Sequence, residues 1–385
     1  MAGKRTRVAL MGAMVFDDIV GQDQALDFLK KVLKSEQISH AYLFVGPEGV
    51  GRRKTALALA AALNCAKGGC GHCSICRRTI RGVYPDLKLI QPEGNFITIE
   101  QIRELQGSIK LRSYEGHRKV IIIDEAGSMN AEASNALLKT LEEPQDEEVF
   151  ILIAASVEEL LPTISSRCQV VPFRRVPREA IIREMVDRRG IDQSQADKIA
   201  RISGGTYSRA LEMLEGEGWR LERREEILSL LKKISGSPVE EAFSVAGALL
   251  SQAVGDQDNL LEVQKEEMEE SLEVAMSPRH GAFIRNKLRK RHARQLSRKR
   301  SLEINDILDI ISSWYRDLLV YQLTAQDSFL INRDHRNEIR DMARRARIER
   351  LTNVLKEIGK IRRMVGFYVN PGAAFEYLCL LLREV

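Results

Sequence analysis

Gly46-Pro-Glu-Gly-Val-Gly-Arg-Arg-Lys-Thr55 is the stretch that decides the fold of this chain. It follows the short apolar run 41–45 and precedes residues 55–63, which are mostly Ala and Leu. A buried strand, a glycine loop and a helix in this order form the unit in which backbone N–H groups and a helix N-terminus bind phosphates. The stretch therefore predicts a nucleotide-binding α/β fold.

The loop departs from the phosphate-loop pattern at the positions that carry its chemistry. Gly46 and Gly51 fit G-x-x-x-x-G-K-[ST], with Gly49 between them, but Arg52 and Arg53 replace the Lys and the Ser or Thr. The Lys contacts the β- and γ-phosphates as a compact charge and the hydroxyl binds Mg²⁺, whereas an Arg side chain is planar and longer. We interpret the loop as a nucleotide-binding fold whose hydrolytic half is lost.

A second part of a nucleotide site follows some 70 residues after the loop. The apolar run 119–123 is typical of a buried parallel strand, and Asp124 and Glu125 come directly after it. In phosphate-loop proteins the first carboxylate after such a strand helps to hold Mg²⁺, and the second polarises the attacking water. The alternative is a strand followed by an acidic helix cap; the preceding glycine loop favours the nucleotide site.

Four of the six cysteines form a C-x4-C-x2-C-x2-C array at Cys65, Cys70, Cys73 and Cys76. Four thiolates at this spacing, with glycines for tight turns, predict a structural zinc site without an open position for catalysis. The alternative is a set of reduced thiols in a surface loop, which their density disfavours. His72 is a bystander, because the fourth cysteine completes the ligand set. Such usage also indicates a reducing compartment, so we expect a cytoplasmic protein.

The composition predicts a soluble protein of two or three domains. The chain has 385 residues, of which 44% are hydrophobic and 29% charged, and no apolar run approaches the roughly 20 residues that cross a bilayer. We therefore expect no membrane partner. We expect residues 1–13 to be a disordered extension, because their apolar part is too short and broken for a signal peptide.

Strand patterns alternate with helix patterns in the first part of the chain, and helix patterns alone follow Pro177. This order predicts an α/β domain with an all-helical remainder. Gly236-Ser-Pro238 is typical of a linker. We therefore expect a base domain at 14–175 with the cysteine module at 65–76, a helical lid at 176–237 and a helical domain at 238–385.

Two opposed blocks of charge lie in the third expected domain. Six Glu oppose one Lys between residues 262 and 273, and ten Lys and Arg without an acidic residue lie between 279 and 300. Such blocks most often form solvated helix faces or pair with each other. The basic block also allows contact with DNA phosphates, which needs no sequence motif, although its core lacks interleaved aromatic residues for base stacking.

Together the motifs resemble the clamp-loader branch of the AAA+ family. The resemblance is carried by Asp18-Ile-Val-Gly-Gln22, His40-Ala-Tyr-Leu-Phe44, residues 46–51, the four cysteines, Ile123-Asp-Glu-Ala126, Asn135-Ala-Leu-Leu-Lys-Thr-Leu-Glu-Glu-Pro144 and Ser166-Arg-Cys168. It covers residues 14–240 well and the C-terminal part weakly. It implies an α/β RecA-like base domain with a parallel sheet, a small helical lid and an all-α collar through which five subunits form a ring.

The resemblance also implies roles that spacing alone does not give. Arg167 in the Ser-Arg-Cys motif would reach the ATP site of a neighbouring subunit as an arginine finger, although a single arginine after a turn is usually solvated or caps a helix. Arg209 in Ser208-Arg-Ala-Leu matches the sensor-2 arginine of the lid. The implied partners are the tau/gamma and delta subunits of bacterial DNA polymerase III, the sliding clamp and primer-template DNA.

Two departures indicate the kind of subunit. Arg52 and Arg53 replace Lys and Thr, and Ala154-Ala-Ser156 stands where active motors carry a sensor-1 Thr or Asn. Both losses fall on the chain's own site, so we expect a subunit that supports clamp loading without intrinsic catalysis. Asp124 and Glu125 are kept, which leaves binding of ATP and Mg²⁺ open. The rival hypotheses are an ATPase motor of the tau/gamma kind and a DNA tether that acts through the basic block.

Overall fold

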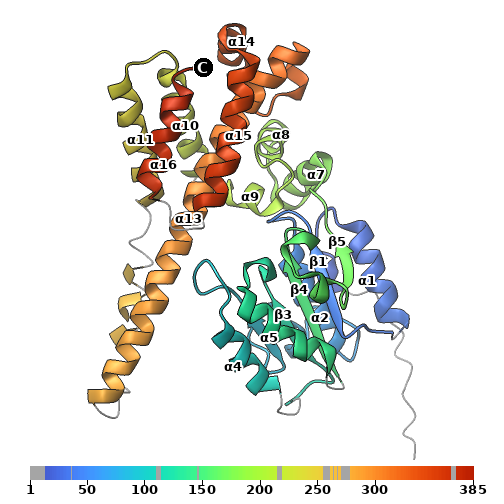
Figure 1. Cartoon of the computed structure of the whole chain (residues 1–385). Helices are drawn as coiled ribbons and strands as arrows, with labels where there is room; N and C mark the ends of the chain where they lie inside the picture. The colour runs from blue at the N-terminus through green and yellow to red at the C-terminus, as the bar shows by residue number, and fades with distance from the viewer. Residues whose placement is uncertain are drawn as a thin grey trace, which may run out of the picture. The chain divides into compact units, whose positions relative to one another are not determined.

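The structure is a computed structural model that describes residues 14–35, 37–109, 114–144, 147–214, 219–254, 261–262, 264–266, 268–269, 278–365 and 370–385. The expected extension at 1–13 lies outside these ranges. The chain separates into two compact units, each with its own core (Figure 1). The first comprises residues up to Pro92 and Phe96–Leu211, and the second comprises Glu93–Asn95 and Glu212–Val385.

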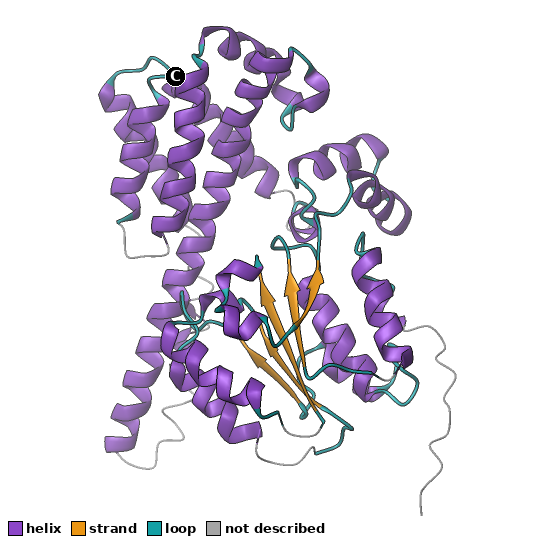
Figure 2. Ribbon diagram, turned by 45° about the vertical axis from the view of Figure 1, so that its right-hand side comes forward, coloured by secondary structure: helices purple, strands orange, loops and turns teal. Residues whose placement is uncertain are grey.

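A five-stranded parallel sheet forms the centre of the first unit (Figure 2). Its strands are Ala41–Val45 (β1), Leu87–Ile90 (β2), Lys119–Ile123 (β3), Glu148–Ala154 (β4) and Gln169–Pro172 (β5). The strand order is β2-β3-β4-β1-β5, and Ala41 of β1 pairs with Phe150 of β4. Because all strands are parallel, the loops after β1, β3 and β4 meet at one edge of the sheet, which brings the glycine loop close to Asp124.

Alternate side chains of these strands enter two separate cores. Tyr42, Phe44 and Ile122 belong to one apolar cluster, whereas Leu43 and Ile121 belong to the other. This alternation follows from the two-residue period of a strand. Helices cover both faces of the sheet, so both faces are apolar. The expected α/β RecA-like domain is thereby confirmed.

The remaining elements of the first unit are short helices. The N-terminal part contains Met14–Phe16 (η1), Asp23–Ser35 (α1), Arg52–Asn64 (α2), Ser74–Ile80 (α3), Ile99–Ile109 (α4), Ala126–Ser128 (η2), Ala131–Glu142 (α5), Val157–Glu159 (η3) and Pro162–Ser165 (α6). Beyond the sheet follow Arg178–Arg189 (α7), Gln193–Ile202 (α8) and Tyr207–Glu212 (α9). Buried Ile181, Met185 and Ile199 lie on α7 and α8, which contact each other.

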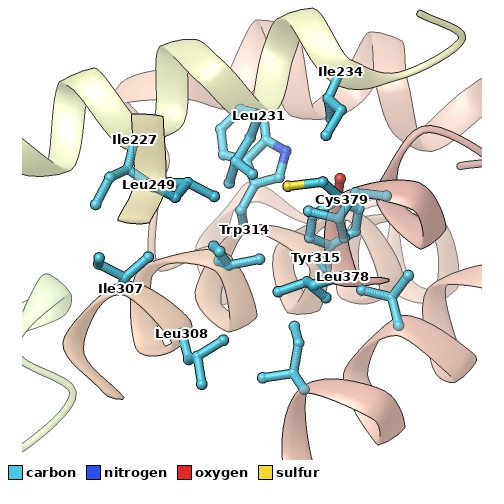
Figure 3. Packing of buried hydrophobic residues seen from close by; sticks show 14 of the residues in the cluster. Ile227, Leu231, Ile234, Leu249, Ile307, Leu308, Trp314, Tyr315, Leu378 and Cys379 are labelled. Carbon is cyan, nitrogen blue, oxygen red and sulfur yellow. The ribbon is translucent and has the colours of Figure 1, made fainter. Parts of the chain in front are cut away.

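The second unit is helical in its described residues. It contains Trp219–Ile234 (α10), Val239–Val254 (α11), Pro278–Thr324 (α13), Asp327–Phe329 (η4), Arg333–His335 (η5), Arg336–Arg345 (α14), Ile348–Val365 (α15) and Pro371–Leu382 (α16). Trp314 and Tyr315 of α13 lie at the centre of its core with Cys379 of α16 (Figure 3). Ile304, Ile307, Leu308 and Ile311 of the same helix are buried in this core as well.

Helix α10 packs against the C-terminal helices, whereas the sequence patterns assigned its residues to the lid domain. Ile227, Leu231 and Ile234 are fully buried in the same cluster as the C-terminal helices. The turn that was expected to be a linker is tied into this unit, because the N–H of Gly236 donates to the carbonyl O of Arg383 at 2.8 Å. The structural boundary therefore falls at 211/212, and the three-domain division with a boundary at 237 stays a prediction.

A buried polar network joins α10 to the segment before α14. The guanidinium of Arg224, 3% exposed, donates to both carboxylate oxygens of Asp334 at 3.0 Å and to Oδ1 of Asn332 at 2.7 Å. Fully buried Asp317 accepts from the backbone N–H of Asn332 at 2.7 Å and from its Nδ2 at 3.0 Å. Each buried polar group thus has partners, as burial requires.

Replacing Arg224 by alanine is expected to destabilise the second unit by about 1–3 kcal/mol, because the fully buried side-chain oxygen of Asn332 would lose its hydrogen-bond donor. The measurement is urea unfolding followed by tryptophan fluorescence, since both tryptophans, Trp219 and Trp314, belong to this unit. Exposed Arg336 provides the control, because its replacement by alanine is expected to change stability by less than about 0.5 kcal/mol. Equal unfolding midpoints for the two variants would contradict a stabilising role of the network.

Candidate functional site

The glycine loop has backbone geometry that only glycine accommodates. Gly46 has φ 151°, and a Cβ there would lie 2.3 Å from the carbonyl O of Phe173. Gly51, with φ 103°, precedes the first residue of α2. Positive φ values in this range are accessible to glycine and costly for other residues. The glycines that the sequence singled out are therefore required by the conformation.

Arg52 turns its charge into the protein. Its side chain is buried, at 9% exposed, and its Nη1 donates to the carbonyl O of Ala154 at the end of β4. Burial lowers the pKa of the Arg52 guanidinium, and nearby carboxylates, Asp124 foremost, partly offset this effect. The same carbonyl O accepts the N–H of Gly46 at 3.3 Å. Arg52 thus fastens the loop to the sheet at the position where a phosphate-loop lysine holds phosphate.

Arg53 faces the carboxylate that would hold Mg²⁺. Its Nη1 lies 3.7 Å from Oδ2 of Asp124, whose side chain is largely buried. Burial raises the pKa of Asp124, and the charge of Arg53 opposes that rise. The N–H of Glu125 and Nε2 of Gln91 also donate to this carboxylate, at 3.1 and 3.3 Å. The structure therefore brings both arginines and Asp124 together.

Helix α9 contacts the tip of the loop. The backbone N–H of Ser208, on α9, donates to the carbonyl O of Gly49 at 3.0 Å. Gly49 has φ 71°, and a Cβ there would lie 2.2 Å from Oγ of Ser208 and 2.4 Å from Cγ2 of Thr206. Half-buried Arg209 follows Ser208 on the same helix. The loop is thus held from the sheet side by Arg52 and from the side of α9 by Ser208.

Arg167 lies on a separate turn after α6. Its Nη2 lies 2.7 Å from Oε1 of Glu142 at the end of α5, and its Nη1 donates to the carbonyl O of Thr163 at 2.8 Å. Its side chain is 36% exposed. Fully buried Ile164 anchors the turn, and burial raises the pKa of the adjacent Cys168 thiol to about 11. The turn is therefore fixed while the guanidinium remains at the surface.

The four cysteines of the array converge on one point. Sγ of Cys65 lies 3.7 Å from Sγ of Cys70 and 3.8 Å from Sγ of Cys73, and all four sulfur atoms lie within 4.8 Å of one another. A tetrahedral zinc site with Zn–S distances of about 2.3 Å separates its sulfur atoms by about 3.8 Å. None of the four forms a disulfide. The residues present therefore fit a zinc ion.

Backbone N–H groups favour the thiolate form of Cys65, whereas burial and the neighbouring sulfur atoms raise the pKa of Cys76. Burial opposes ionisation of Cys65, but backbone N–H groups of Cys70, Gly69 and Lys67 outweigh it and lower the pKa of this thiol to about 6. Sγ of Cys73 also accepts the N–H of Cys76 and so caps α3. His72 is outside the cluster, and its Nδ1 pairs with the carbonyl O of Cys70 at 2.8 Å.

Comparison with known proteins identifies the family. A family model described as DNA polymerase III, delta subunit, matches residues 21–177, and one described as its C-terminal region matches residues 282–379. The two models together match more than half of the chain, and they match it in the same order. This chain belongs to the DNA polymerase III delta and delta-prime family of clamp-loader subunits.

Individual relatives agree with this membership. The delta-prime subunit of Bacillus subtilis (strain 168) is 29% identical over 371 residues, which cover 94% of this clamp-loader subunit and 96% of the relative. The delta-prime subunit of Pseudomonas aeruginosa is 37% identical over 54% of this chain and 66% of its own length. The tau subunit of B. subtilis is 33% identical over 52% of this chain but only 37% of its own length.

In this clamp-loader subunit, two contacts of the loop lie beyond what its motifs indicate. The carbonyl O of Ala154 joins Gly46 to Arg52, and Ser208 closes on Gly49. Each contact has a backbone carbonyl as its acceptor, so the residue type of the acceptor carries no signal for it. Ala154 was named from the sequence only because active motors carry a sensor-1 Thr or Asn in this segment. Every helix in the described part of the chain is too short or too polar to cross a membrane.

Proposed function

We propose that the chain is a non-hydrolysing clamp-loader subunit of the replicative DNA polymerase III holoenzyme. It supports ATP-dependent loading of the sliding clamp onto primed DNA and donates Arg167 to the ATP site of a neighbouring subunit. The observation that carries this proposal is the use of Arg52 and Arg53 within the chain's own loop, where they bond to Ala154 and face Asp124. Both guanidinium groups that would otherwise bind phosphates therefore already have partners within the chain.

The proposed partners follow from the family. They are the tau/gamma and delta subunits in a hetero-pentamer, the sliding clamp, and primer-template DNA in the assembled complex. The relatives named delta-prime and tau support a cytoplasmic replication factor. In this proposal residues 14–175 form the base, the helices after 176 form the lid, and the C-terminal helices form the collar.

The proposed cofactor is one structural Zn²⁺ held by Cys65, Cys70, Cys73 and Cys76. Bound zinc would link the end of α2 to the start of α3, because the ligands come from both sides of the intervening loop. In the degenerate nucleotide site, Asp124 retains the carboxylate that helps to hold Mg²⁺ in phosphate-loop proteins, and Glu125 retains the one that polarises the attacking water. Arg209 of the lid belongs to the same site, which we propose does not hydrolyse ATP.

The alternative is an ATPase motor of the tau/gamma kind, which the retained Asp124-Glu125 pair and the match to tau favour. It requires Arg52 to leave Ala154 and take the role of the lysine. Its guanidinium would then approach the phosphates as a planar fork instead of a point charge. The buried position of Arg52 favours the non-hydrolysing subunit.

Titration of the purified chain with a fluorescent ATP analogue and Mg²⁺ distinguishes the two functions. We expect no saturable binding in the micromolar range and no turnover, because Arg53 pairs with Asp124 and Arg52 is bound to the sheet. An Arg52→Lys, Arg53→Thr double variant restores the phosphate-loop pattern and is expected to gain binding. Micromolar binding with turnover by the unmodified chain would instead assign it as a motor subunit.

A further inference from the structure

The N-terminal part of α13 carries a concentrated positive charge that the proposed function does not use. Residues 285–300, here called the basic arm, contain nine Lys and Arg and no acidic residue. The arm extends beyond the other labelled helices of the second unit, as the orange helix in Figure 1 shows. Within it the side chains of Arg285, Arg289, Lys290, Arg291 and Arg294 are exposed.

One face of the basic arm is covered by the preceding segment of the chain. Leu288 and His292 are buried, and so is Gln264 of the preceding segment. Nε2 of Gln264 donates to the carbonyl O of His292 at 3.4 Å and to Oε1 of Gln295 at 3.0 Å. Residues 288, 292 and 295 share one helix face by their spacing, so Lys290 and Arg294 lie on the opposite, exposed face.

The charge of the arm matches a nucleic-acid backbone. The 14 residues from Arg285 to Arg298 span about 20 Å of helix, and duplex DNA carries one negative charge per about 1.7 Å of its axis. Arg294 lies 3.6 Å from Glu93, but both side chains are nearly half exposed. An ion pair so exposed is weak, so a phosphate can replace Glu93 as the partner of Arg294 at little cost.

The arm suits the duplex backbone better than unpaired bases. The only ring within residues 285–300 is that of His292, which is buried against the preceding segment. Single-strand binding sites use exposed aromatic rings on which bases stack, and the arm presents none. We propose that the basic arm binds the phosphate backbone of double-stranded DNA without sequence specificity, which adds a DNA contact made by this chain itself.

The test uses the full-length chain and fluorescence anisotropy of a labelled DNA duplex over a series of salt concentrations. The arm variant replaces four exposed residues by glutamine, which keeps the helix propensity: Arg285, Arg289, Lys290 and Arg294. The control variant removes the same charge from exposed positions elsewhere in the second unit, also by glutamine: Arg336, Arg344, Arg345 and Arg347. Circular dichroism verifies that both variants keep their helices.

We expect the arm variant to bind the duplex at least about tenfold more weakly at low salt. A plot of the logarithm of the binding constant against the logarithm of the salt concentration is expected to be less steep by up to about 3.6, because each of the four lost phosphate contacts accounts for about 0.9. The control variant is expected to keep the slope of the unmodified chain. Wild-type affinity and slope in the arm variant would overturn the proposal, as would an equal loss in the control. Arg167→Ala should leave this binding unchanged, so failure here is distinct from failure of the clamp-loader proposal.

Discussion

Replacing Arg167 by alanine is expected to slow ATP hydrolysis by about 10³-fold or more at the subunit interface that we propose this residue serves. An arginine finger stabilises the negative charge that develops on the transferred phosphoryl group, and its loss costs about 10³–10⁵ in rate in related nucleotide hydrolases. The effect falls on the neighbour's site, because this chain's own loop has lost the lysine and hydroxyl of a hydrolytic site. Clamp loading that depends on that site is expected to fall with it.

Arg167 combines a fixed backbone with an exposed guanidinium, and a residue that acts in a neighbouring site needs both. Its turn is anchored by buried Ile164, and its guanidinium, 36% exposed, rests on Glu142. This exposed ion pair contributes about 0–1 kcal/mol at most. The side chain can therefore leave Glu142 for a phosphate at small cost, while the backbone that positions it stays fixed.

The measurement is the ATPase and clamp-loading rate of a reconstituted loader in which the other ATP sites are inactivated, so that the site served by Arg167 is observed alone. Arg167→Lys keeps the charge but loses the planar fork, and we expect it to remain strongly impaired. Glu142→Gln is the matched control, because it removes only the resting partner of Arg167 and is expected to leave both rates intact. Undiminished rates in Arg167→Ala would refute the finger role.

The sequence predicted strands β1 and β3 and the residues around the phosphate loop because these follow from local patterns. Apolar runs such as 119–123 marked buried strands, and the spacing of Gly46 and Gly51 marked the loop. Asp124 came directly after a strand, and parallel strands bring such ends to one edge. The positions of these residues could therefore be predicted without any knowledge of long-range contacts.

The contacts that hold the loop could not be predicted in this way. Arg52 bonds a carbonyl 102 residues away, and Ser208 reaches Gly49 through backbone atoms. Backbone donors and acceptors are present in every residue, so the sequence does not identify which of them meet. Helix α10 shows the same limit, because its apolar face is equally suited to a lid or to the C-terminal core, and only the packing assigns Ile227 to the latter.

Removing the metal from the cysteine module is expected to disorder the module and lower the stability of the first unit. Structural zinc sites in small peptides hold their metal with about 10–16 kcal/mol of apparent free energy, and the binding energy contributes to folding. Here Cys65, Cys70 and Cys76 are buried, and Gly69, directly before Cys70, accepts the N–H of Val15 at 3.2 Å. The module therefore supports residues of the base domain as well as itself.

Without the ion, four sulfur atoms within 4.8 Å would each have to stay neutral or repel one another. Protonation would stop the sulfur of Cys73 from acting as a strong acceptor for the first turn of α3. Gly69 has little freedom to rearrange, since even a Cβ there would lie 2.8 Å from Cγ2 of Val15. We therefore expect the loss of stability to exceed the about 0.5–3 kcal/mol of an ordinary substitution.

Metal analysis and thermal unfolding of Cys76→Ser and Cys168→Ser variants decide the matter. Cys76 is fully buried within the cluster, whereas Cys168 lies outside it and serves as the matched control. We expect one zinc per chain in the unmodified protein and in Cys168→Ser, and loss of zinc together with a lowered melting temperature in Cys76→Ser. A strong chelator should lower the melting temperature of the unmodified protein in the same way, because it removes the ion that joins the four cysteines. A melting temperature that changes with neither the Cys76→Ser substitution nor the chelator would contradict a structural metal.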